Sequence, residues 1–176
     1  MKKNIAIIYK SKYGTTKQYS EWIADELNAS LLNAEEVKAD QLRSFDVVIY
    51  GGGLYAGGID GVKLVTKNLP KKLVVFTVGL ANPKITDYTD ILNKNFAPDL
   101  LANIKVFHLR GGMDYKKLSF IHKGMMSMVC KSTAKKPETE RTEEDKLFLE
   151  TYGQKINFLD TNAIAPLVDY VRNLGD

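Results

Sequence analysis

Short apolar runs separated by polar segments dominate the pattern along the chain. Four runs contain almost no polar residues and lack the alternation of a half-exposed strand: Ile5–Tyr9, Val47–Tyr50, Leu73–Val78 and Ile104–Leu109. Strands that are covered on both faces have such continuous runs. A weaker run, Leu31–Ala34, supplies a fifth candidate. The pattern therefore predicts five strands in the interior of one sheet.

Helical patterns alternate with these runs. The first begins at Thr15, where Tyr19, Ile23 and Leu27 recur near one stripe of a helix. Further helices are predicted at Gly61–Leu69, Ile85–Asn95 and Asn162–Leu174, the last with Asn162 as its N-cap, and a short helix or turn at Ala39–Leu42. Alternating strands and helices predict a parallel sheet with right-handed crossovers and helices on both faces, a three-layer α/β sandwich.

In such a sheet, ligands bind beyond the carboxyl ends of the strands. The loop after the first strand, Lys10–Lys17, carries hydroxyl groups, a glycine and the start of a helix with free backbone amides. These groups suit a phosphate monoester. An ordinary helix cap, in which Thr15 or Thr16 binds an orphan amide, explains the loop equally well. The glycine-rich loop of nucleoside triphosphatases is absent, which argues against NTP hydrolysis.

A glycine-rich loop, Gly51–Gly58, is predicted after the third strand. It formally matches the dinucleotide pattern G-x-G-x-x-G/A, but it lacks an acidic residue about 20 positions later, so tightly bound NAD is not expected. Glycines let the backbone approach a flat ring, and Leu54 and Tyr55 offer apolar or stacking surface. After the fourth strand, the small residues of Val78–Ala81 leave backbone amides that could face the polar edge of a ring.

The composition points to one cytoplasmic domain. The 176 residues are enough to bury a core without metals or disulfides, and we expect a single domain over residues 1–176. The longest uncharged stretch, Val47–Ile59, contains five glycines and is too short to span a membrane. The single cysteine, Cys130, cannot form an internal disulfide, which fits a reducing compartment.

Positive charge is concentrated in one segment. The net charge of the chain is +4, but residues 105–136 hold eight Lys and Arg against one acid, Asp114, and the remainder sums to −3. A helix predicted at Lys116–Lys131 has an apolar stripe made of Leu118, Ile121, Met125, Met128 and Val129. Its lysines and Phe120 lie elsewhere on the helix, so it either packs on the domain or contacts an anionic membrane peripherally. No nucleic-acid partner is expected.

Other reactive residues do not form a recognisable site. His108 and His122 are not spaced as metal ligands, and no cysteine or carboxylate cluster joins them, so no metal site is expected. We expect both histidines to be structural. A Ser/His/Asp set in a nucleophile-elbow context is also absent, which argues against hydrolase chemistry. The sequence therefore assigns no catalytic side chain.

The three loops, in this order on a five-strand pattern, resemble those of the flavodoxin family. Ser11, Gly14 and Thr16 fit its S/T-x-x-G-x-T phosphate loop. The resemblance implies the strand order 2-1-3-4-5 and non-covalently bound FMN, with Ser11–Lys17 at the phosphate and the other two loops beside the isoalloxazine. The cofactor-binding residues implied in this way are Ser11, Lys12, Tyr13, Gly14, Thr15, Thr16, Gly52, Gly53, Leu54, Tyr55, Ala56, Gly57, Val78, Gly79, Leu80 and Ala81.

Beyond the fifth strand, the chain is similar to menaquinone-dependent protoporphyrinogen IX dehydrogenases, a flavodoxin-like subgroup of heme biosynthesis. The similarity lies in a basic, methionine-rich helical insertion at about residues 111–136 and in the segment Val78–Lys84. Where that subgroup tends to carry an Arg-Tyr pair, this chain has Tyr55 and Ala56.

This resemblance implies an FMN-dependent oxidoreductase with a small-molecule redox substrate between the flavin and the insertion. The propionates of protoporphyrinogen would suit Arg110, Lys116 and Lys117, and a quinone would accept the electrons. The alternative is an electron-carrier flavodoxin that serves redox proteins. Its docking would be steered by charge, and carriers of this kind usually present an acidic face. The sequence leaves the oligomeric state open.

Overall fold

A computed structural model describes residues 3–175, and its central element is a parallel sheet with the strand order β2-β1-β3-β5-β6. The strands of this sheet are β1 (Ile5–Lys10), β2 (Ser30–Asn33), β3 (Val47–Tyr55), β5 (Leu73–Gly79) and β6 (Lys105–Arg110). Numbered along the chain, this is the predicted order 2-1-3-4-5, and the predicted α/β fold class is confirmed. Residues 1, 2 and 176 of the predicted domain lie outside the described part.

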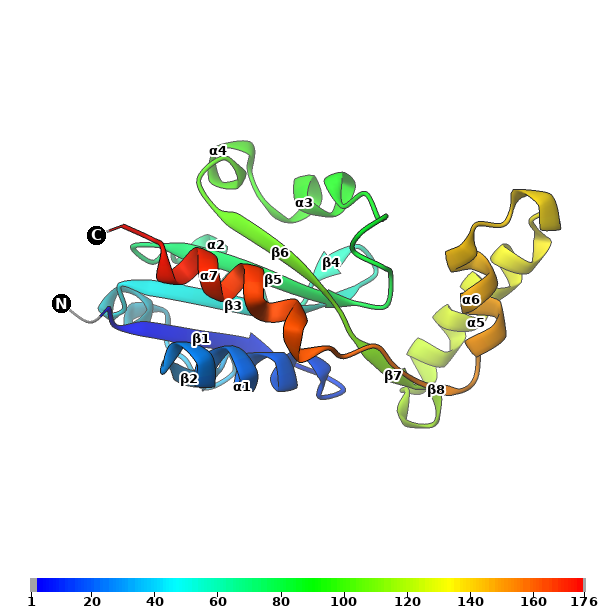
Figure 1. The fold of residues 1–176 in the computed structure, drawn as a ribbon, viewed down its shortest axis with the longest axis horizontal. Coiled ribbons are helices and arrows are strands. Elements are labelled where there is room, and N and C mark those ends of the chain that lie inside the picture. Colours follow the sequence, from blue (N-terminus) through cyan, green and yellow to red (C-terminus); the bar gives the residue numbers. More distant parts are fainter. Residues whose placement is uncertain (1–2, 176) are drawn as a thin grey trace.

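Helices cover both faces of the sheet (Figure 1). One face carries α1 (Thr15–Leu27) and α7 (Ala165–Arg172), and the other carries η1 (Ala39–Ser44), α2 (Lys63–Lys67), α3 (Thr89–Asn95) and α4 (Pro98–Leu101). Neighbouring residues of β1 enter opposite layers, because Ile7 packs with α1 and α7 whereas Ile8 packs with the other helices. Both layers are apolar, which explains the continuous apolar runs in the sequence.

The segment predicted as a glycine loop is instead a strand and a tight hairpin. β3 continues to Tyr55, and β4 (Gly58–Ile59) pairs with it in antiparallel orientation. The turn residues Ala56 and Gly57 have φ values of 49° and 73°. A Cβ on Gly51 would lie 2.2 Å from Cζ of Phe76, so glycine here makes room for a buried ring on the neighbouring strand. The loop prediction was wrong for residues 51–55, because Gly51 serves sheet packing, whereas Gly57 does make the chain reversal.

Carboxylates set the starts of two helical segments at residues other than those predicted. The segment after β5 becomes helical only at Thr89, where the carboxylate of Asp87 accepts hydrogen bonds from the Thr89 amide and hydroxyl. Before α7, the carboxylate of Asp160 accepts from the Asn162 amide at 2.9 Å and starts the 3-10 helix η4 (Thr161–Ile164). Asp160, and not the predicted Asn162, is therefore the cap at this end of the chain.

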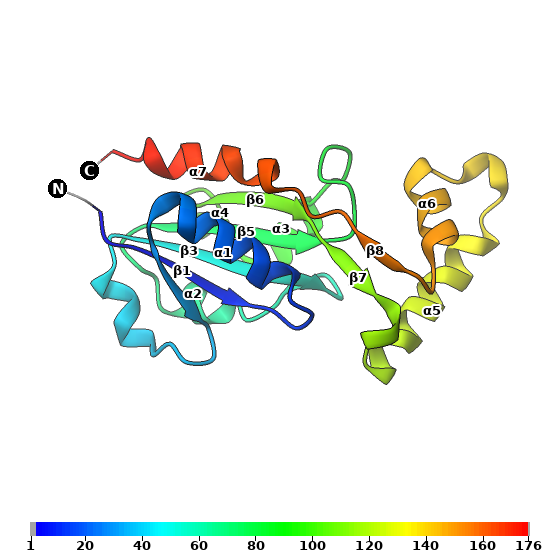
Figure 2. The same ribbon diagram turned by 60° about the horizontal axis from the view of Figure 1, so that its bottom comes forward.

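After β6 the chain leaves the sheet and forms a lobe that projects beyond it (Figures 1 and 2). We call residues 112–157 the helical lobe. It consists of β7 (Gly112–Asp114), η2 (Tyr115–Lys117), α5 (Phe120–Lys135), η3 (Glu138–Glu140), α6 (Glu143–Thr151) and β8 (Lys155–Asn157). β7 and β8 pair in antiparallel orientation as the stalk of the lobe. The lobe thus extends past the insertion predicted at about 111–136.

None of the helices within residues 3–175 is long and apolar enough to cross a membrane. α5 begins at Phe120 and not at Lys116, since the Ser119 hydroxyl accepts a hydrogen bond from the His122 amide and caps the helix there.

Candidate functional site

The three predicted loops meet at the carboxyl edge of the sheet. An ideal Cβ on Gly53 would lie 3.6 Å from Thr16 Oγ1, which places the phosphate loop beside the end of β3. A Cβ on Gly79 would lie 3.0 Å from Leu54 Cδ1, which places the end of β5 on the other side of that strand. The strand order brings β1, β3 and β5 side by side, so segments far apart in sequence form one surface.

The loop predicted to bind phosphate, Ser11–Lys17, leads into a helix start that suits an anion. Gly14, with φ 94°, makes the bend between β1 and α1, and its amide donates to Ser11 Oγ at 3.1 Å. The first bond of the helix runs from the Gln18 amide to the Gly14 carbonyl at 3.0 Å. No side chain of the described residues caps this helix, so the ordinary threonine cap is not what the structure has. The amides of the first turn point out of the helix end, where they suit a phosphate.

Two hydroxyl groups of this loop lie close to other strand ends of the site. Thr16 is almost fully buried and faces β3, whereas Thr15 is half-buried. A Cβ on Gly111 would lie 3.3 Å from Thr15 Oγ1 and 2.7 Å from Val78 Cγ1. Gly111 therefore lies where the first and third loops meet, and only glycine fits there. The sequence reasoning did not single out this residue.

The end of β3 supplies an aromatic side chain at the mouth of the site. Tyr55 is 43% exposed, and the hairpin beyond it is fixed from α3. Lys94 Nζ donates to the Ala56 carbonyl at 3.1 Å, and Asn95 Nδ2 donates to the Gly57 carbonyl at 3.0 Å. The predicted residues Gly52 to Gly57 thus form a braced hairpin and not a mobile loop.

The third predicted segment is tied to the base of the helical lobe. Val78 and Gly79 are the last residues of β5, and Leu80 and Ala81 follow the strand. The Gly79 carbonyl accepts from the Gly111 amide at 2.7 Å, and the Leu80 carbonyl accepts from Arg110 Nε at 2.8 Å.

Arg110 does not face an open substrate site. Its Nη2 lies 3.3 Å from Glu144 Oε1, and its guanidinium carbon lies 3.9 Å from the centre of the Phe158 ring. The carboxylate comes from α6, which the sequence analysis did not place here, and the contact of Arg110 with a substrate propionate stays a prediction. Arg110 fastens the lobe to the domain.

His122 of α5 lies against two of the predicted flavin residues. Its ring centre is 4.2 Å from that of Tyr55, and its Nδ1 is hydrogen-bonded to the hydroxyl of Tyr13. Lys12 Nζ lies 3.5 Å from Nε2 of the same ring. Burial and the nearby Lys12 charge lower the pKa of His122. Tyr55 also donates a hydrogen bond to Met125 Sδ at 3.0 Å, so α5 covers this part of the site.

The sequence reasoning classed His122 as a packing residue and missed its place at the site. No local signal could have revealed it, because its partners precede it by many elements and the lobe itself was only partly predicted. His108, by contrast, is structural as expected. It stacks on Tyr88 at 3.6 Å between ring centres and lies 2.6 Å from Thr77 Oγ1, and burial lowers its pKa to about 4.

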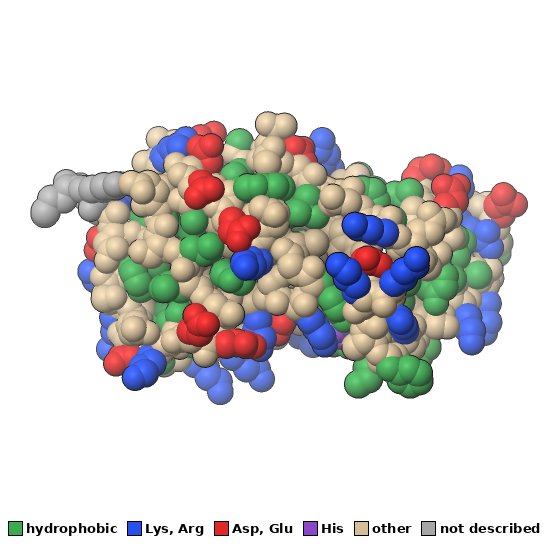
Figure 3. All heavy atoms as spheres, turned by 90° about the horizontal axis from the view of Figure 1, so that it is seen from below, with side chains coloured by type: hydrophobic (Ala, Val, Ile, Leu, Met, Phe, Trp, Pro, Cys, Tyr) green, Lys and Arg blue, Asp and Glu red, His purple; other side chains and the backbone are tan. Residues whose placement is uncertain are grey.

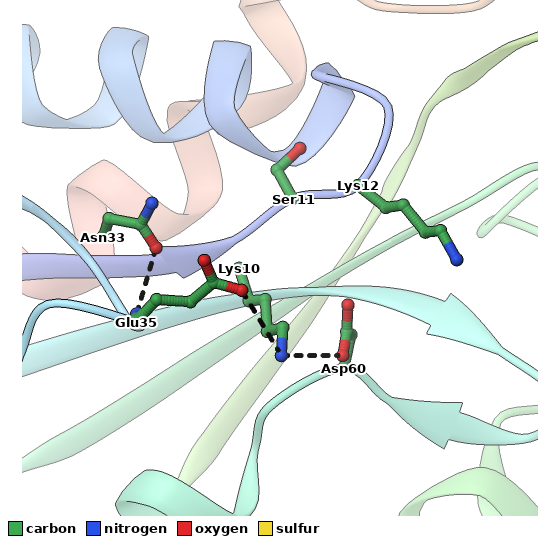
Figure 4. A pocket seen from close by; sticks show the side chains of 6 residues that line it. All are labelled: Lys10, Ser11, Lys12, Asn33, Glu35 and Asp60. Atoms are coloured by element: carbon green, nitrogen blue, oxygen red, sulfur yellow. Dashed lines mark hydrogen bonds and ion pairs between the residues drawn. The ribbon is translucent and has the colours of Figure 1, made fainter. Parts of the chain in front are cut away.

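A polar cavity of about 350 Å³ adjoins the phosphate loop on the side of β2 (Figure 4). Its lining residues are Lys10, Ser11, Lys12, Asn33, Glu35 and Asp60. Lys10 Nζ lies between two carboxylates, 3.8 Å from Glu35 and 3.9 Å from Asp60. The positive charge of Lys10 is therefore neutralised by these two carboxylates. Lys12 extends away from them (Figure 4).

The donor set fits a flavin phosphate and does not fit a metal. Within residues 3–175, no group of three His, Cys, Asp or Glu side chains could hold a metal ion. The site instead combines uncapped helix amides, hydroxyls, Lys12 and the ring of Tyr55 around glycines that leave the backbone open. These groups are those that a phosphate and a flat aromatic ring require.

Comparison with known proteins agrees with this geometry. The model of a flavodoxin domain family matches residues 6–140. An uncharacterised protein of Methanocaldococcus jannaschii is 38% identical over 52 residues, which are 29% of this chain and 35% of that protein, so the match spans about a third of the relative.

Two solved structures are similar to this one at low identity. A flavoprotein of Lactobacillus acidophilus in complex with FMN is 13% identical, with a TM-score of 0.41 over 61% of this chain and 92% of that chain. A WrbA-like flavodoxin of Agrobacterium tumefaciens is 15% identical, with a TM-score of 0.43 over 97% of this chain and 98% of that chain.

Proposed function

The chain belongs to the flavodoxin domain family, and on this premise we propose that it binds FMN non-covalently and acts in redox reactions. The observation that carries the proposal is the meeting of three loops at one sheet edge, with an uncapped helix end beside an exposed tyrosine. When bound, FMN supplies the electron-transfer chemistry, and the protein supplies position and electrostatics.

In this proposal, each segment has a separate task. The amides at the start of α1, with the hydroxyls of Thr15 and Thr16, hold the phosphate, and Lys12 offsets its charge. Tyr55 offers a face to the ring system, and Gly53 and Gly79 let the backbone come close to it. α5 covers the site from outside and limits the access of water.

A titration of the purified protein with FMN tests the proposal. A ligand that binds only the folded state increases the free energy of unfolding and so raises Tm. At a ligand concentration of about a hundred times Kd, the increase is about 2.7 kcal/mol. Riboflavin, which lacks the phosphate, is the matched control ligand. The double variant Thr15→Ala with Thr16→Val should weaken FMN binding about 10- to 100-fold and leave riboflavin binding unchanged, since bonds to a charged group are worth about 1.5–3 kcal/mol. A protein that neither binds FMN nor gains thermal stability from it would refute the proposal.

A finer proposal concerns the substrate. We propose that the protein oxidises protoporphyrinogen IX to protoporphyrin IX in successive two-electron steps. In each step the substrate loses two electrons and two protons, and one quinone molecule takes up the same number and becomes a quinol, so that three quinones are consumed for each porphyrin. The support is the basic start of the lobe, where Lys116 and Lys117 are exposed beside the covered site and suit an anionic substrate.

Anaerobic mixing separates this proposal from the electron-carrier alternative. Protoporphyrinogen should bleach the flavin absorbance of the FMN-loaded protein, and a quinone should restore it. The double variant Lys116→Ala with Lys117→Ala should raise KM with little change in kcat, because uniform binding would be lost. An unchanged spectrum together with rapid electron exchange with a redox protein would favour the carrier.

A further inference from the structure

Four large apolar side chains of α5 are exposed to solvent. Phe120 is 92% exposed, Ile121 71%, Met128 72% and Val129 51%. We call these four residues the apolar tip of α5. They make up half of the eight large hydrophobic residues found exposed within residues 3–175. The predicted apolar stripe of this helix therefore does not pack on the domain as a unit.

The inner side of the same helix explains why. His122 and Thr133 are its buried residues, and His122 is held by the phosphate loop and Tyr55. Phe120, Met128 and Lys135 are spaced to lie on the side opposite these anchors. The contacts of His122 fix the orientation of α5, so Phe120 and Met128 must face outward with Ile121 at their side. Val129 lies seven residues after His122, on the anchored side of the helix, and is nevertheless 51% exposed.

Lysines surround the apolar tip without acidic partners. Lys116, Lys117, Lys123, Lys131 and Lys135 make no ion pair among the described residues, and between residues 115 and 137 the sequence has no acid. Only Lys136 in this stretch meets a carboxylate, Asp145 at 3.0 Å. The surface view shows hydrophobic side chains protruding from the lobe with Lys and Arg side chains gathered near them (Figure 3).

From this combination we propose that the apolar tip and its five lysines dock the protein on an anionic lipid surface. Lysines would meet the lipid headgroups while Phe120 and Ile121 enter the boundary of the acyl chains. Charge complementarity favours a membrane over an apolar protein partner, because lysines dominate the rim of the tip and carry long apolar stems that suit an interface. Four apolar side chains make such docking reversible. The proposal does not depend on bound FMN.

Co-sedimentation with vesicles tests the docking. Protein without added FMN should pellet at low salt with phosphatidylcholine vesicles that contain phosphatidylserine, and not with phosphatidylcholine alone. Raising the salt should release it, since the headgroup attraction is screened. Failure to pellet with anionic vesicles at low salt overturns the proposal, whatever the result of the FMN titration.

Matched variants separate local docking from net charge. One variant changes three lysines near the apolar tip to Glu: Lys116, Lys117 and Lys123. Its control changes three lysines at the other end of the molecule to Glu: Lys63, Lys67 and Lys72. The first should lose binding by more than a hundredfold, at about fivefold or more per reversed lysine, and the control should bind like the wild type. Phe120→Ser should weaken binding, and Ile85→Ser, at an exposed site on another loop, should not. Equal losses in a variant and its control would overturn the proposal.

Discussion

His108 offers a quantitative test of how the sheet is covered, because its partly buried ring has neutral neighbours on two sides. Thr77 Oγ1 lies 2.6 Å from its Nδ1, and the ring of Tyr88 stacks on it at 3.6 Å between ring centres with an interplanar angle of 7°. Burial lowers the pKa of His108 from 6.5 to about 4. Protonation would place a cation in a layer that solvates it poorly.

The sign of the effect follows from proton binding. As the pH falls below 6.5, the unfolded chain protonates this ring whereas the folded chain keeps it neutral, so folding stability is lost. Between about pH 7.5 and about pH 5, such a shift amounts to about 2 kcal/mol, and solvent screening at a partly exposed ring reduces this to about 1 kcal/mol. For a chain of this length, the acid step lowers Tm by about 2–4 °C.

The assay is thermal unfolding followed by circular dichroism at the two pH values. His108→Asn keeps an oxygen that can accept a hydrogen bond from Thr77 but cannot titrate, so its Tm should change less between the two pH values than that of the wild type. His122→Asn removes the other histidine and should retain most of the acid-induced loss. If His108→Asn loses as much Tm on acidification as the wild type, the burial argument is wrong.

Two further predictions concern the site. Gly51→Ala should destabilise the fold by about 1–3 kcal/mol, because its Cβ would overlap the buried ring of Phe76, whereas Gly53→Ala should unfold like the wild type and bind FMN about tenfold more weakly in a calorimetric titration. His122→Ala should bind FMN about two- to tenfold more tightly. In the wild type the His122 ring occupies the face of Tyr55, and FMN must displace this aromatic contact of about 0.5–1.5 kcal/mol, which the variant lacks. Weaker binding by the variant would mean that His122 contacts the flavin itself.

The sheet could be predicted from sequence because burial on both faces leaves a direct pattern. Ile5 to Lys10 and Leu73 to Gly79 were found to within one residue, since nothing but strand packing explains their apolar runs. The end of β3 could not be predicted in the same way. Glycines at 51 to 53 are typical of loops, and only tertiary neighbours explain why this strand contains them. A Cβ on Gly51 would overlap the ring of Phe76, and a Cβ on Gly52 would overlap Ile59 of the hairpin.

The candidate site divides along the same line. The phosphate loop is a local motif, so Ser11, Gly14 and Thr16 could be chosen from sequence alone. Gly111 and His122 belong to the site only because they contact residues far from them in the sequence, and a single sequence does not reveal such contacts. The lobe was missed in part because β7 and β8 have three residues each and carry no apolar run.

The two sides of α5 lead to a last prediction, which rests on both proposals. Phe120 and His122 belong to one helical turn, so a membrane that binds the apolar tip should also weaken the contact between His122 and Tyr55. Anionic vesicles should then increase the FMN affinity of the wild type, by no more than the factor by which His122→Ala increases it. FMN should increase the affinity for vesicles by the same factor, because coupling between two ligands is reciprocal. In His122→Ala, vesicles should leave FMN affinity unchanged. Equal FMN affinity of the wild type with and without vesicles, in a protein that binds both, would show that α5 moves as one body with the domain and that membrane docking does not control access to the site.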